Sequence, residues 1–119
     1  MPGPRRTNIF SRPARGNAAF GGYSTAEDLL RFTNAVLADR LLVPAYTDWY
    51  LTGVEPGKGT PLPRAHGELG WTGGTPGGNA VLLAELATGY TVIVLSNYDA
   101  PSASDVAHTI RRILSGVVR

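Results

Sequence analysis

Two apolar segments of strand length stand three residues apart in the second half of the chain. They cover residues 80–86 and 90–96, and Ala87-Thr88-Gly89 between them ends on a glycine where a left-handed turn residue is needed. This spacing predicts an antiparallel hairpin. The second segment barely alternates between apolar and polar residues, so we expect cover on both of its faces, with helices supplying some of it.

Two helices are predicted before the hairpin. Ser24-Thr25-Ala26-Glu27 fits a capping box, in which the serine hydroxyl accepts from the backbone of Glu27, and the apolar residues after it recur at helical spacing to about Asp39. Residues 43–53 predict a shorter helix, with proline in its first turn and a glycine after its end. A loop rich in proline and glycine is expected from Gly53 to Gly70. A loop of this length indicates that it either serves a site or replaces structure that has been deleted.

A third helix is predicted at the end of the chain, where an apolar stripe runs from Ala103 to Val117. We expect Ser102 or Ser104 to cap it. Asp105 near its start and Arg111 and Arg112 near its end agree with the helix dipole.

Composition limits the chain to one small domain and excludes several kinds of site. The 119 residues suffice for a single core. We divide the chain into an irregular arm at 1–22 and a domain at 23–119. The net charge of +2 comes from basic residues that are scattered, which argues against a nucleic-acid partner. Cysteine is absent, and His66 and His108 are far apart, so we expect no disulfide and no metal site. No apolar run reaches membrane-spanning length and no secretory signal is present, so as written the chain is expected in the cytoplasm, unless an upstream signal segment is missing.

A search for a nucleophile finds no established serine motif. There is no G-x-S-x-G sequence, and a cap serine and a helix histidine explain the spacing of Ser104 and His108. The single lysine is Lys58, and Glu55 stands three residues before it, where a Ser-x-x-Lys motif requires serine.

Three stretches in order carry a family resemblance. Residues 22–32 read GYSTAEDLLRF, residues 70–77 read GWTGGTPG, and residues 89–99 read GYTVIVLSNYD. Together they resemble the C-terminal part of the serine β-lactamase and penicillin-binding-protein superfamily, in particular class C β-lactamase-like hydrolases and family VIII carboxylesterases. The resemblance implies an α/β (α+β) fold: a partial β-lactamase-like domain whose antiparallel sheet, with a C-terminal strand hairpin, is packed by helices. The domain at 23–119 would accordingly be the C-terminal portion of a larger one.

The resemblance also assigns a candidate site. Trp71-Thr72-Gly73 matches the family's third catalytic motif on the edge strand of the active site, commonly Lys-Thr-Gly in lactamases and His-x-Gly or Trp-x-Gly in esterases, so Trp71 favours an esterase. The amide of Gly74 would be one of two donors to the tetrahedral oxyanion. Trp71, Thr72, Gly73 and Thr75 would contact a small ester or amide substrate, and no cofactor is implied.

The family's other motifs are missing. Neither its Ser-x-x-Lys nor its Tyr-x-Asn occurs in this sequence. Three hypotheses follow: an esterase-like serine hydrolase domain present without its Ser-x-x-Lys half, a free-standing small hydrolase that uses Ser24, Ser96 or Ser104, and a non-catalytic interaction module. An exposed sheet edge further predicts a homodimer, or pairing with the missing catalytic half.

Overall fold

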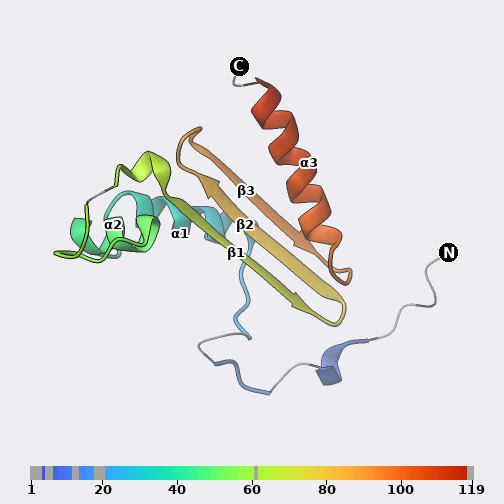
Figure 1. Cartoon of the computed structure of the whole chain (residues 1–119). Helices are drawn as coiled ribbons and strands as arrows, with labels where there is room; N and C mark the ends of the chain where they lie inside the picture. Colours follow the sequence, from blue (N-terminus) through green and yellow to red (C-terminus); the bar gives the residue numbers. More distant parts are fainter. Residues whose placement is uncertain (1–3, 5–6, 12–13, 18–20, 61, 118–119) are drawn as a thin grey trace.

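A computed structural model describes residues 4, 7–11, 14–17, 21–60 and 62–117 of the chain (Figure 1). This part contains three α-helices and one antiparallel sheet of three strands in the order β1-β2-β3. The elements are η1 (Ile9–Ser11), α1 (Ala26–Leu37), α2 (Pro44–Thr52), η2 (Arg64–His66), β1 (Glu68–Thr75), β2 (Gly78–Glu85), β3 (Tyr90–Ser96) and α3 (Ser102–Val117). The α+β fold expected from the resemblance is confirmed.

Two tight connections build the sheet. Pro76-Gly77 joins β1 to β2, with Gly77 at φ 72° and Thr75 paired with Gly78. The predicted hairpin of β2 and β3 is confirmed, but its connection has four residues, 86–89, because Glu85 pairs directly with Tyr90. Gly89 adopts the expected left-handed conformation at φ 74°.

Two apolar clusters cover opposite faces of the sheet. On one face α3 packs against β2 and β3, and the buried residues there are Val81, Val92, Ala103 and Ala107. On the other face α1 and α2 close over the sheet, around Val36, Leu51, Leu69 and Ala84. Because α1 and α3 both contact β3, the expectation that this strand is covered on both faces is confirmed.

The cap of α1 lies one residue later than predicted. Thr25 is the N-cap, and its hydroxyl accepts from the N–H of Asp28 at 3.1 Å and donates to the Asp28 carboxylate at 2.9 Å. The Ser24 hydroxyl instead donates to the Thr25 carbonyl. The prediction of Ser24 was wrong because two adjacent hydroxyl residues compete for one cap position, and each has an acidic residue three positions on.

The cap of α3 comes from another element altogether. Ser102 and Ser104 both lie inside the helix, so neither is its N-cap. The Asn79 side chain on β2 instead accepts from the N–H of Ala103 at 2.8 Å. The helix also runs to Val117, which leaves Arg111 before its last turn, so the predicted basic end was wrong. Arg111 pairs with Glu85 on β2.

The loop after α2 is shorter than predicted. It starts at Gly53, which caps α2 at φ 75°, and β1 already begins at Glu68. Before β1 the chain passes so close to α2 that a Cβ on Gly67 would lie 2.5 Å from the Leu51 carbonyl oxygen. None of the helices in the described ranges is long and apolar enough to cross a bilayer.

Candidate functional site

The candidate site residues all lie on β1, one of the two edge strands of the described sheet. Trp71, Thr72, Gly73, Gly74 and Thr75 are all exposed, and Leu69 is the one buried residue of the strand. Side chains alternate along a strand, so Trp71 and Thr75 face the α1 and α2 side, whereas Thr72 faces the α3 side. The predicted residues therefore share one strand, and their side chains lie on two faces.

The direction of each amide on β1 follows from the turn after it. Pro76 and Gly77 form a hydrogen-bonded turn, so Thr75 and Gly78 are a hydrogen-bonded pair. In an antiparallel ladder such pairs alternate with pairs that exchange no hydrogen bonds. Counting back along the register, Gly73 faces β2 and the N–H of Gly74 points to the open edge of β1.

Trp71 lies among other aromatic rings. Its ring centroid is 5.7 Å from that of Phe32 on α1 and 6.4 Å from that of Tyr50 on α2, both in tilted geometry. Such pairs stabilise each other beyond their burial. Burial raises the pKa of Tyr50 above its usual range, so its hydroxyl stays protonated at neutral pH. On this side of β1, Trp71 therefore contacts aromatic rings from both helices.

The other side of β1 borders a groove of about 370 Å³ between this strand and α3. Thr72 lines it from the strand, and Ser104, His108 and Arg111 line it from the helix. Ser104 and His108, which are one helical turn apart on α3, thus line the same groove. A separate hollow is lined by Leu42, Tyr46, Trp49 and Tyr50.

Two residues that sequence reasoning missed hold the turn at the end of β1. The Asp99 carboxylate accepts from the N–H of Gly77 at 2.8 Å, and the Asn8 side chain donates to the Pro76 carbonyl at 2.6 Å. Both partners are distant in sequence, so no local pattern reveals them. They fix the turn that sets the direction of the Gly74 amide.

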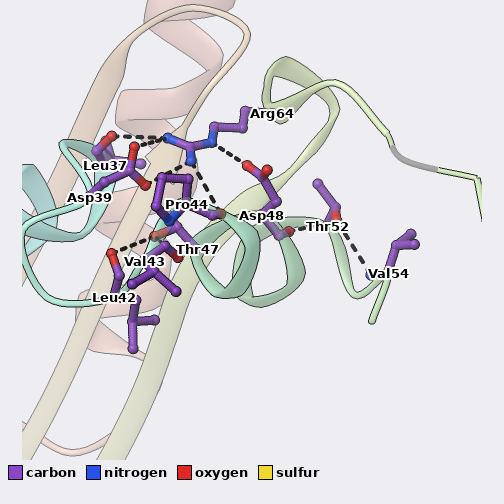
Figure 2. A network of polar contacts seen from close by, with 10 residues as sticks. All are labelled: Leu37, Asp39, Leu42, Val43, Pro44, Thr47, Asp48, Thr52, Val54 and Arg64. Atoms are coloured by element: carbon purple, nitrogen blue, oxygen red, sulfur yellow. Dashed lines mark hydrogen bonds and ion pairs between the residues drawn. The ribbon is translucent and has the colours of Figure 1, made fainter. Parts of the chain in front are cut away.

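Arg64 anchors the start of β1 to both helices before it (Figure 2). Its guanidinium donates to Asp39 after α1, at 2.7 and 3.2 Å, and to Asp48 on α2. It also donates to the carbonyls of Leu37 and Pro44, at 3.3 and 3.5 Å. The two carboxylates raise the pKa of Arg64 further above its already high value, so the residue is always charged.

Arg64→Met is expected to lower the free energy of unfolding by about 1–2 kcal/mol, since the network is partly exposed and solvent screens it. The loss follows because two carboxylates would remain close together without their shared cation. Urea unfolding at neutral pH measures it. The control is Arg31→Met, which removes ion pairs to Glu27 and Asp28 whose side chains are more than half exposed. An equal loss in both variants would contradict a special role for Arg64.

Asp39 gives this network a dependence on pH. Hydrogen bonds from Arg64 and then from Thr47 lower the pKa of the Asp39 carboxyl. A carboxyl whose pKa is lowered by folding stabilises the fold above its unfolded pKa of about 4, and this contribution is lost as pH falls through the folded pKa. The residue has φ 57°, a conformation that asparagine tolerates, so Asp39→Asn keeps the backbone.

We therefore expect Asp39→Asn to be less stable than wild type above pH 5, and the two stabilities to converge as pH falls below 4. Urea unfolding at a series of pH values tests this. Asp105→Asn, at an exposed position on α3, serves as the control. A stability difference that stays constant from pH 7 to pH 3 would show that ionisation of Asp39 does not matter.

Two of the three serine candidates, Ser24 and Ser96, have hydrogen-bond partners other than a base. Ser96 accepts a hydrogen bond from the Ser102 hydroxyl at 2.8 Å and one from the N–H of Tyr98. Ser24 lies exposed before α1. Across the part of the chain that the structure describes, no three His, Asp or Glu side chains gather in a way that could hold a metal ion.

The antiparallel sheet with helices on both faces and a glycine-rich edge strand is the arrangement that the resemblance to the serine β-lactamase and penicillin-binding-protein superfamily implies. A family model described as Beta-lactamase matches residues 1–116. The chain belongs to the β-lactamase family, and the resemblance drawn from the sequence is confirmed. Neither the curated proteins nor the solved structures include a match to the chain.

Proposed function

We propose that this chain supplies the oxyanion-stabilising strand of a serine hydrolase that cleaves small esters through an acyl-enzyme. The observation that carries the proposal is the N–H of Gly74, which points out of the sheet at the open edge of β1. The absence of a side chain there lets a substrate carbonyl approach the backbone closely. Family membership makes acyl transfer the chemistry to test first.

In this reaction a serine oxygen adds to the ester carbonyl carbon while a base takes its proton. The carbonyl oxygen becomes an oxyanion, to which the Gly74 N–H donates. Collapse expels the alcohol, which takes up a proton, and water then releases the acid from the serine by the same steps. The serine and its base would come from a Ser-x-x-Lys segment, which this sequence does not contain.

The surroundings of Trp71 favour an ester over a charged β-lactam. The ring packs against those of Phe32 and Tyr50. An aromatic wall of this kind suits an uncharged acyl or alcohol group better than a carboxylate. Trp71 and Thr72, on the two faces of the strand, would shape the acyl or leaving-group pocket.

The test is to sequence the DNA upstream of the Met1 codon and to express whatever reading frame continues there, joined to this chain. An in-frame Ser-x-x-Lys and hydrolysis of 4-nitrophenyl butyrate in preference to nitrocefin would support the proposal. Preference for the lactam would overturn the ester assignment. Hydrolysis of neither substrate by the joined protein would overturn the catalytic role.

A fluorophosphonate probe on the chain alone separates the free-standing hydrolase from this proposal. We expect no labelled serine, because the Ser96 hydroxyl already bonds to Ser102 and the Ser24 hydroxyl donates to the Thr25 carbonyl rather than to a base. Labelling of Ser24, Ser96 or Ser104, located by peptide mapping, would favour the free-standing enzyme.

The outer edge of β3 favours an interaction module as a second candidate. Hydrogen-bonded and non-hydrogen-bonded pairs alternate along the ladder from the first hairpin onward, so β3 bonds to β2 through residues 90, 92, 94 and 96. The backbone groups of Thr91, Ile93 and Leu95 therefore point outward. No described strand pairs with that edge. This open edge supports pairing with a second copy or with a nucleophile-bearing half.

We expect the chain alone to form a dimer at micromolar concentration, measured by light scattering, through β3 edges of two copies. Leu95→Lys should shift it to monomer, because a charge at an exposed edge position opposes strand pairing. Leu95 is 47% exposed, and the matched control is Leu41→Lys, at a leucine that is 52% exposed outside the sheet. A monomeric wild type would count against this pairing.

A further inference from the structure

Asn79 is a buried polar residue with two well-formed hydrogen bonds and no role in the mechanism so far. It lies on β2 directly opposite Gly74 and is 6% exposed. Its side-chain oxygen accepts from the N–H of Ala103 at 2.8 Å, and its side-chain nitrogen donates to the carbonyl of Gly73 at 2.9 Å. A backbone N–H can only donate, so the Ala103 contact fixes which end of the amide faces Gly73.

The Gly73 carbonyl belongs to the same peptide unit as the Gly74 N–H. A trans peptide is planar, and its C=O and N–H point in opposite directions. The bond from Asn79 therefore holds the carbonyl toward β2 and, with it, the N–H toward the open edge. Asn79 thus orients the N–H donor of the proposed oxyanion site from the side of the peptide that faces β2.

This peptide needs such a restraint because a glycine stands on each side of it. Glycine populates a much wider range of backbone conformations than other residues. A Cβ at Gly73 would have no neighbour within 4 Å, so no side chain from another element packs against this position. On the side facing β2, the Asn79 bond adds to the strand ladder.

The bonds also run in one direction. Ala103 lies in the first turn of α3, where N–H groups carry the positive end of the helix dipole. That N–H donates to Asn79, Asn79 donates to Gly73, and the Gly74 N–H is the next donor in line. Hydrogen bonds in such a series polarise one another, which strengthens the last donor.

We propose that Asn79 is the positioning residue of the oxyanion site, which aims and polarises the Gly73–Gly74 peptide from the start of α3. The inference rests on the proposed function for the role of Gly74. It assigns Asn79 a task beyond capping α3, and the two tasks use different atoms of one side chain.

The variant Asn79→Asp separates the two tasks. It keeps an oxygen that accepts from the Ala103 N–H and removes the donor to Gly73. We expect helicity by circular dichroism to stay as in wild type, while nuclear magnetic resonance shows an upfield shift of the Gly74 amide proton and its faster exchange with solvent. The control is the same change at an exposed position on α1, Asn34→Asp, which should leave the Gly74 amide as in wild type.

An unchanged Gly74 amide in a folded Asn79→Asp protein would overturn the inference. If that variant does not fold, a measurement on the wild-type protein takes its place. We expect a scalar coupling across the hydrogen bond, between the Asn79 side-chain nitrogen and the Gly73 carbonyl carbon. Its absence would overturn the inference. Neither measurement depends on hydrolysis.

In the joined hydrolase, Asn79→Asp should lower kcat for the ester about tenfold, less than removal of an oxyanion donor costs, and leave KM unchanged. A change in KM alone would contradict the positioning role. If the wild-type amide behaves as expected but no joined protein hydrolyses ester, the proposed function fails and the assignment of Asn79 as the residue that orients this peptide stands.

Discussion

Gly74→Pro is expected to lower kcat for ester hydrolysis by about 10²–10³-fold in the joined hydrolase, because proline has no N–H to donate to the oxyanion. The substitution should spare the sheet. The Gly74 N–H points to the open edge, so no ladder bond to β2 is lost. Steady-state kinetics with 4-nitrophenyl butyrate measure the effect, and unfolding in urea checks that the fold persists.

Gly74→Ala is the matched control, since it adds a side chain and keeps the N–H. A Cβ at this position would meet nothing closer than 3.9 Å. We expect its kcat to stay within a few-fold of wild type, a loss small beside that of a missing donor. Equal losses in the two variants would show that access, rather than the amide, limits the reaction.

Leu69→Ala should produce the largest loss of stability, about 3 kcal/mol. Leu69 is 3% exposed and is the residue of β1 that joins Val36 on α1 and Leu51 on α2 in one cluster. Its truncation would leave a cavity where the two helices meet the sheet, which the surrounding backbone can close only in part. Urea unfolding followed by circular dichroism gives the value.

The same chemical change at Leu30, which is 41% exposed on α1, serves as the control. We expect Leu30→Ala to change stability by less than about 0.5 kcal/mol, since it creates no cavity and alanine favours a helix. A comparable loss at both leucines would mean that the cluster around Leu69 is not the core that holds the helices to the sheet.

Elements whose signals are local could be predicted from the sequence. The β2–β3 hairpin follows from two apolar runs and Gly89, and α2 follows from Pro44 and Gly53, since each signal lies within the element that it defines. The cap of α3 could not be predicted, because its acceptor, Asn79, is 24 residues away from Ala103. The residues around Asn79 in the sequence carry no sign of this task.

The candidate site shows the same division. Its strand was found through three matched stretches, and the structure brings Trp71 to Gly74 onto one open edge. The residues that hold this strand in place, Arg64 at its start and Asp99 at its end, act through contacts between distant parts of the chain. A single sequence without an alignment has no pattern that reveals such pairs.

The length of the two-residue turn at Pro76-Gly77 also decides which residues of β1 face β2 and which face the open edge. An antiparallel ladder alternates with a period of two, so one residue inserted into or deleted from this turn, if the register shifted with it, would exchange the inward and outward positions along β1. Gly73 would then face outward and Gly74 would be tied to β2. The turn can therefore vary in composition far more easily than in length.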